Sequence, residues 1–126
     1  MGITRASLQL RNPLKGRLAA MTVDALADTG ALHLCIPQHV ALQLELQENE
    51  QREVTLADGG KKIVSYVGPI EVQFDSRRCF VGAMVLGDEV LLGAIPMEDM
   101  DLIVHPATKK VLVNPASPNI PSSLAK

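Results

Sequence analysis

Short apolar segments of strand length, each ended by turn-forming residues, recur along the whole chain. In residues 6–12, apolar and polar side chains alternate, which is the period of a half-buried strand. Asn12, Pro13 and Gly16 then supply a turn, and the apolar residues 17–27 predict a returning strand. We therefore expect the chain to open with a β-hairpin.

The same pattern predicts strands for most of the remaining chain. Strands are expected in residues 32–36, in 52–74 on both sides of a glycine-rich tip at Asp58-Gly59-Gly60, in 78–86, in 89–94, and in a final hairpin over 101–115. Pro69 marks a break or a sheet edge. Proline at a first helical position predicts two short helices, over 37–46 and 96–102. Glu98 and Asp99 would then suit the first turn of the second helix.

These segments add up to one mainly β domain. A chain of 126 residues suits a single core, and 47% hydrophobic but only 2% aromatic residues mean a core of Val, Leu, Ile, Ala and Met. We predict an all-β fold over residues 1–113, a closed barrel with one or two short helices. Residues 114–126 contain Pro115, Pro118 and Pro121 and are predicted to form an extended tail.

Composition and charge exclude several classes of partner. The formal net charge is -2 and the sequence pI is near 5.9, with no basic cluster, so no nucleic acid is expected as a partner. No apolar run is long enough to cross a membrane, and a signal peptide is not indicated, so we expect a cytoplasmic protein. Cys35 and Cys79 are expected to be buried thiols. Neither they nor His33, His39 and His105 have metal-ligand spacing, so no metal is expected.

The sequence ALADTGALH places an Asp-Thr-Gly turn, residues 28–30, directly after an apolar strand. Such a turn is common by itself, because all three residue types favour turns for local reasons. Here a second apolar strand follows it, and the glycine-tipped hairpin at Asp58 comes thirty residues later. A strand end at Leu92-Gly93 then precedes a short helix. The order of these segments is a more specific indication of fold and function than the Asp-Thr-Gly turn alone.

Over residues 3–113 the order resembles that of the retropepsin-like aspartic proteases, the single-domain relatives of pepsin. The family pattern runs from an apolar strand through Asp-Thr/Ser-Gly-Ala and a flap hairpin to two hydrophobic residues and a glycine before a helix. The matching segments are Asp28-Thr29-Gly30-Ala31, the hairpin around Asp58-Gly59, and Leu91-Leu92-Gly93. The segment VTLADGG resembles the flap of bacterial and cellular members more than that of viral ones.

The resemblance implies an aspartic endopeptidase that cuts extended polypeptide and needs no cofactor. Two facing carboxylates that share one proton can activate a water molecule and protonate the leaving amide. The chain has a single Asp-Thr/Ser-Gly, because the nearest imitation, at 75–77, lacks the glycine. The second carboxylate must therefore be Asp28 of an identical chain, and we expect a homodimer. The expected catalytic residues are Asp28, Thr29 and Gly30.

The resemblance also implies roles for the neighbouring residues. Those expected to bind substrate are Ala31, Ala57, Asp58, Gly59, Gly60, Leu92 and Gly93. Because Gly30 has no Cβ, backbone N–H groups can approach the carboxylate, and the Thr29 hydroxyl would bond to the partner turn. The flap would close over a peptide and hydrogen-bond its backbone. Residues 102–106, 111–115 and the tail are the candidate dimer contacts.

Two positions depart from the viral members of the family. Leu32 stands where they have an acidic residue, and Ala94 stands where they have arginine. The charge pair that braces the viral loop is therefore missing, and we expect an apolar contact to replace it. The predicted flap also lacks an aromatic residue near its tip, and Tyr66 is expected to pack in the sheet.

An alternative function keeps the same fold. In it, a catalytically silent dimer binds an extended peptide or joins subunits, and Asp28 cuts nothing. The intact Asp-Thr-Gly favours the enzyme over this binding module. A Ser-His-Asp hydrolase is not indicated, since no serine lies in a G-x-S-x-G turn. Glu98, Asp99 and Asp101 are expected on a solvated helix face rather than as a second acid-base pair.

Overall fold

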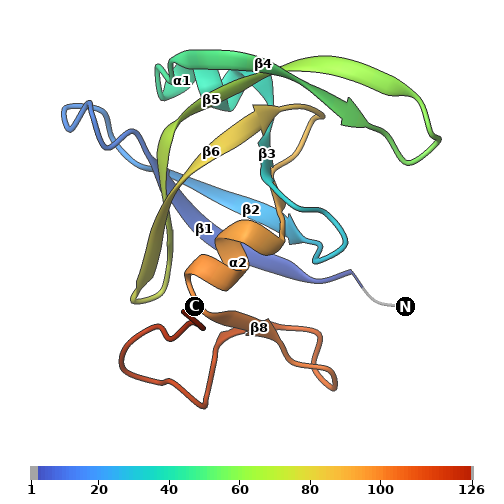
Figure 1. The fold of residues 1–126 in the computed structure, drawn as a ribbon. Coiled ribbons are helices and arrows are strands. Elements are labelled where there is room, and N and C mark those ends of the chain that lie inside the picture. Colours follow the sequence, from blue (N-terminus) through green and yellow to red (C-terminus); the bar gives the residue numbers. More distant parts are fainter. Residues whose placement is uncertain (1–2, 126) are drawn as a thin grey trace.

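A closed ring of six strands forms the body of the molecule (Figure 1). The computed structural model describes residues 3–125. The ring consists of β1 (Arg5–Arg11), β2 (Met21–Ala27), β7 (Leu91–Leu92), β3 (Leu34–Ile36), β6 (Arg77–Val85) and β5 (Lys61–Phe74), which pairs back onto β1. The β2–β7 and β3–β6 pairs are parallel and the other pairs are antiparallel. The predicted closed, mainly β barrel and its opening hairpin are confirmed.

A long hairpin, formed by β4 (Glu48–Thr55) and β5, projects from this ring. Strand β4 pairs with β5 alone, and Figure 1 shows the hairpin reaching beyond the barrel on the side of the β2–β3 loop. Its tip lies at Asp58-Gly59-Gly60, as predicted. Gly59 has a φ of +87°, its N–H donates to Leu56 O at 2.9 Å, and the Leu56 N–H donates to Gly60 O at 2.7 Å. Glycine supplies the left-handed backbone that this turn requires.

Strand β5 does not break at Pro69. The strand continues through this residue, so the predicted break was wrong. The ladder with β4 ends at Val67 and the ladder with β1 begins at Glu71, so Pro69 lies at a local edge of the sheet, as the alternative prediction stated. The pairing of β5 with β6 shifts register between Val67 and Ile70, which is a local bulge. A bulge leaves a residue without a ladder partner, and therefore accommodates proline, which has no N–H to donate.

Two six-residue helices, α1 (Gln38–Gln43) and α2 (Ala94–Asp99), occupy the predicted regions but begin differently. Pro37 caps α1 with an extended backbone and is not its first residue. Helix α2 begins before Pro96, so Glu98 and Asp99 lie in its last turn and the predicted acidic first turn was wrong. Pro96 falls within the first turn, where its missing N–H has no helical acceptor. Among the described residues no helix is long and apolar enough to cross a membrane.

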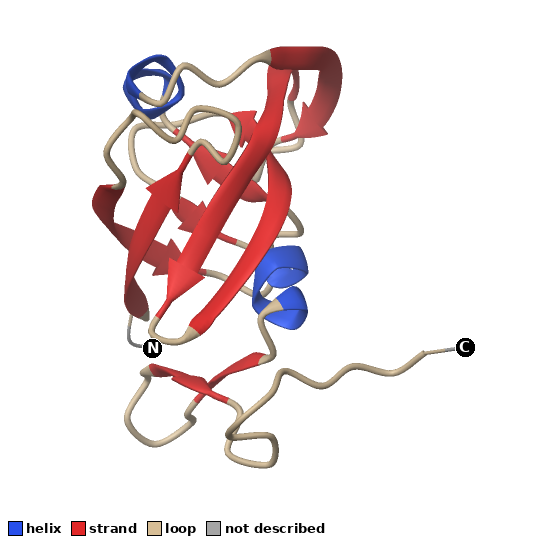
Figure 2. Ribbon diagram, turned by 90° about the vertical axis from the view of Figure 1, so that its left-hand side faces the viewer, coloured by secondary structure: helices blue, strands red, loops and turns tan. Residues whose placement is uncertain are grey.

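Below the barrel lies a second, two-stranded sheet of β8 (Leu102–Val104) and β9 (Val111–Val113), which is the predicted last hairpin (Figure 2). The core between the elements is aliphatic, as the composition predicted. Its fully buried side chains include Leu8, Leu10, Leu34, Ile36, Val40, Leu44, Ile70, Val72, Leu92 and Met100. Along β1 the buried and exposed residues alternate strictly, which fixes the side of the strand that faces the core.

Candidate active site

The Asp28 carboxylate is held by the backbone of its own turn. Strand β2 ends at Ala27, next to Leu92 of β7, and the Asp28 N–H donates to Leu92 O at 3.0 Å. The Gly30 N–H donates to Asp28 Oδ1 at 2.9 Å. A Cβ at Gly30 would lie 3.1 Å from that same oxygen, so glycine leaves room for the approach. The carboxylate is thus oriented and remains exposed to solvent.

Hydrogen bonds from the first residues of α2 hold the loop that follows Asp28. The Ala94 N–H donates to Ala31 O and the Ile95 N–H donates to Leu32 O, both at 2.8 Å. Gly93 is buried beneath this loop, and a Cβ there would lie 2.3 Å from the backbone oxygen of His33. The Leu32 side chain is 59% exposed, so the expected apolar brace was wrong. Backbone hydrogen bonds hold the loop instead.

A groove of about 630 Å³ lies between this loop and the β4–β5 hairpin. It is lined by Gly30, Ala31, Leu32, His33, Cys35, Arg52, Glu53, Val54, Thr55, Leu56, Ala57, Met84, Leu86 and Leu91. The groove therefore brings together Gly30 and Ala31 from the loop and Ala57 from the hairpin. Of the other expected residues, Asp58, Gly59 and Gly60 are exposed at the hairpin tip, whereas Leu92 and Gly93 are buried. The last two can act on the site by supporting the loop.

Thr29 does not line this groove and instead lines a second pocket. It lines a space of about 440 Å³ together with Ala94, Met97, Glu98, Leu102, Ile103 and Val104. Helix α2 and strand β8 thus form one surface with the Asp-Thr-Gly turn. Thr29 is exposed, and its hydroxyl makes no hydrogen bond within residues 3–125.

A stacked arginine on the groove wall was not predicted. The guanidinium carbon of Arg52 lies 3.7 Å from the centroid of the Tyr66 ring, and Arg52 Nε donates to Glu50 Oε2 at 2.6 Å. The His33 ring meets Tyr66 edge-on at 6.2 Å between centroids. Burial and then the Arg52 charge lower the pKa of His33 below 6.5. Tyr66 packs in the sheet as expected, because a Cβ at Gly82 would lie 2.2 Å from its ring.

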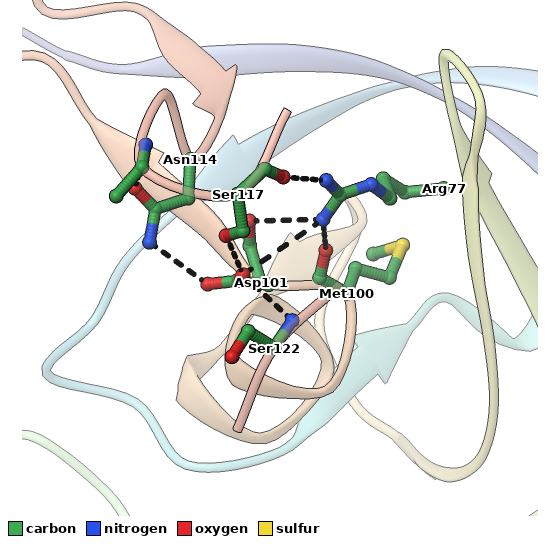
Figure 3. A network of polar contacts seen from close by, with 7 residues as sticks. Arg77, Met100, Asp101, Asn114, Ser117 and Ser122 are labelled. Atoms are coloured by element: carbon green, nitrogen blue, oxygen red, sulfur yellow. Dashed lines mark hydrogen bonds and ion pairs between the residues drawn. The ribbon is translucent and has the colours of Figure 1, made fainter. Parts of the chain in front are cut away.

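Residues 75–77, the imperfect copy of the Asp-Thr-Gly turn, form the β5–β6 turn and serve a structural role. Arg77 is 3% exposed, and its guanidinium donates to Met100 O at 2.9 Å and to Ser117 O (Figure 3). In Figure 1 this turn lies on the other side of the barrel from the β2–β3 loop. No second carboxylate of the expected kind is therefore supplied from this segment.

Asp101 is not on a solvated helix face, which corrects that prediction. It follows α2, and its carboxylate accepts hydrogen bonds from Asn114 Nδ2 at 3.0 Å, from the Ser122 N–H at 2.9 Å and from Ser117 Oγ (Figure 3). The Ser117, Asn114 and Ser122 hydrogen bonds lower its pKa from 3.8 to about 2. Part of the proline-rich tail is thus tied to Asp101 of its own chain. We refer to this network, with Arg77, as the Asp101 clasp.

The cysteines are free thiols. Cys79 is buried as expected, and Cys35 is half-buried beside the groove. Burial raises the pKa of both thiols, and with the Asp99 charge it raises that of Cys79 to about 12. Within residues 3–125 no three His, Cys, Asp or Glu side chains are grouped as ligands for a metal ion.

Comparison of the sequence with models of protein families and with curated proteins found no match.

Proposed function

We propose that the protein is a retropepsin-like aspartic endopeptidase that works as a homodimer on extended polypeptide. The observation that carries the proposal is the Asp28 carboxylate, which is exposed, oriented by the Gly30 N–H and part of the loop whose residues Gly30 and Ala31 line a groove under a projecting hairpin. An oriented carboxylate next to a peptide-sized groove has the placement of a general base for water attack. No metal ion or organic cofactor enters this mechanism.

The dimer follows from the chemistry of amide hydrolysis. One carboxylate has to take a proton from water while another supplies a proton to the leaving nitrogen. Within residues 3–125 the only hydrogen bond to the Asp28 carboxylate comes from Gly30, so one chain provides half of such a pair. Thr29 and β8 share a surface beside Asp28. A twofold axis through that surface brings two Asp28 residues face to face, and the Thr29 hydroxyls then bond across the axis.

The β4–β5 hairpin is proposed as the flap. It is attached to the barrel through β5 alone, and it lines the groove through its residues Arg52 to Ala57. A hairpin anchored on one side opens at low free-energy cost compared with a core strand. Closing it over a bound peptide supplies backbone hydrogen bonds and excludes water from the carboxylates.

Replacement of the proposed base tests this function. Asp28→Asn should abolish hydrolysis of a mixed peptide library, whereas Asp24→Asn, which changes an exposed carboxylate on the strand that leads to Asp28, should not. Both variants should form the same dimer as the wild type. Cleavage at the wild-type rate by Asp28→Asn would reject Asp28 as the base.

A mixing experiment tests whether the centre is shared between chains. Equal amounts of wild type and Asp28→Asn, exchanged to equilibrium, leave about one quarter of the dimers with two Asp28 residues. Activity per wild-type chain should therefore fall by about half. If it stays constant, each chain holds a complete centre and the shared dyad is wrong.

The binding module is retained as a second candidate because the described chain pairs no other carboxylate with Asp28. It predicts that wild type and Asp28→Asn retain the same peptides equally well and that neither cleaves them at acidic or neutral pH.

A further inference from the structure

The side chains that the β4–β5 hairpin presents to the groove differ in polarity along its length. Arg52, Val54 and Leu56 are half-buried, whereas the residues between them are exposed. The groove side of the hairpin thus presents two aliphatic side chains near the tip and a cation further away. Alternate residues of a strand are spaced by about 7 Å, and an extended peptide has the same spacing. Successive side chains on one face of a bound peptide therefore meet these three residues in turn.

The Arg52 guanidinium is held in a fixed plane. Tyr66 lies beneath it at 3.7 Å, and Glu50 accepts a hydrogen bond from Nε at 2.6 Å. Within residues 3–125 that is its only hydrogen bond, so the two terminal nitrogens keep their N–H groups for another acceptor. Two parallel N–H groups in a fixed plane match the geometry of a carboxylate. The Glu50 carboxylate offsets part of the Arg52 charge, but it bonds to Nε alone and leaves the two terminal nitrogens open to a substrate carboxylate.

The charged groups around Arg52 are paired, so the open N–H groups of Arg52, and not a net positive charge, would select the ligand. Glu53 lines the groove, but its carboxylate lies 3.8 Å from the Lys61 ammonium. His33 lies on the opposite wall, where it adds a hydrogen-bonding group. The remaining lining from the barrel is aliphatic and sulfur-containing.

From this arrangement we infer that Arg52 is a specificity-determining residue that binds an acidic side chain of the substrate. The preferred substrate is an extended peptide with aliphatic residues at the cleavage point and an aspartate or glutamate further along, at the Arg52 end of the groove. The preference in cleavage rests on the proposed protease function. The preference of Arg52 for an acidic side chain in peptide binding does not depend on cleavage.

Paired peptides test the inference. Each pair has the same aliphatic centre and differs by Glu or Gln at one flanking position, which is moved stepwise along the peptide. At one position, wild type should cleave the Glu peptide with a kcat/KM about tenfold higher, because a charge-assisted bidentate pair is lost with Gln. Arg52→Gln should abolish this preference. Arg52→Glu should reverse it in favour of a Lys peptide.

Matched variants separate charge from geometry. Arg52→Lys keeps the charge but loses the planar fork, so it should retain part of the preference. Arg78→Gln removes an exposed arginine of β6 that does not line the groove, and it should leave the preference unchanged. Circular dichroism of each variant confirms that it is folded.

Binding by Asp28→Asn, measured by fluorescence anisotropy with the same peptides, separates this inference from the proposed function. Cleavage of Glu and Gln peptides at equal rates at every position overturns the inference and leaves the protease intact. An Arg52-dependent preference for Glu in binding, without cleavage by wild type, supports the inference and overturns the protease. Failure to bind or cleave any peptide overturns both.

Discussion

Replacing Gly93 with alanine is the sharpest test of how the Asp28 loop is held. Gly93 lies beneath the loop with no space for a side chain. An added Cβ would be 2.3 Å from His33 O and 2.8 Å from the Leu32 carbonyl carbon. Ordinary carbon contacts are about 3.5 to 4.0 Å, so the backbone must shift by about an ångström. Flexible side chains cannot absorb the clash, because the contacted atoms are backbone.

The expected cost follows from the contacts that the shift disturbs. Overpacking of this kind destabilises by about 1 to 3 kcal/mol. The hydrogen bonds from Ala94 and Ile95 to the loop, both 2.8 Å, contribute about 1 kcal/mol each. Gly93→Ala should therefore lower the free energy of unfolding by about 3 to 5 kcal/mol. For a chain of this length, that is a fall in Tm of about 11 to 19 °C.

Thermal unfolding by circular dichroism, at one protein concentration for all variants, measures this effect. Gly16→Ala is the matched control, because a Cβ at Gly16 has no atom within 4 Å and its Tm should change little. Peptidase activity of Gly93→Ala should be lost even where the variant is folded, since the Asp28 loop has moved. A variant with the wild-type Tm and activity would show that the crossing of the loop over Gly93 is not the support described above.

Four further predictions concern other groups. Arg77→Met should destabilise by about 3 kcal/mol in urea unfolding, because buried carbonyl acceptors lose their donor. Asp101 has a lowered pKa in the folded state, so its stabilisation is present above pH 3.8 and lost as the pH falls to about 2. The urea midpoint of Asp101→Asn should therefore depend less on pH over that range. Iodoacetamide should modify native Cys79 far more slowly than Cys35, since its thiol has a pKa of about 12. Gly82→Ala should displace the Tyr66 ring and weaken any preference for acidic peptides, measured with the Glu and Gln pairs.

The positions of most strands along the chain could be predicted from the sequence, because they depend on local patterns. Alternation along β1 and the glycine tip at Gly59 are set by neighbouring residues, and both were found where expected. The start of α2 was misplaced because its first N–H groups bond to Ala31 and Leu32, more than sixty residues earlier in the chain. Nothing near Pro96 in the sequence reveals those acceptors.

The residues of the candidate site also differ in whether local sequence patterns predict them. The Asp28 turn carries its own signal, since the side chain bonds to a backbone group two residues away. The Arg52–Tyr66 stack depends on the register of β4 with β5, which places Tyr66 opposite Glu50 and diagonal to Arg52. A register of this kind is a property of the folded sheet. In the sequence, the alternation of Val54 and Leu56 with Glu53 and Thr55 was the available signal for a strand with one apolar face, and Arg52 falls on that face by the period of two.

The Asp101 clasp determines where the chain can be shortened. The Arg77 guanidinium is buried, and one of its acceptors, Ser117 O, belongs to the proline-rich tail. Truncation after residue 113 would leave that positive charge in the interior with fewer acceptors and would deprive Asp101 of all three of its hydrogen-bond donors. A minimal version of the protein for crystallisation or engineering should therefore extend through Ser122.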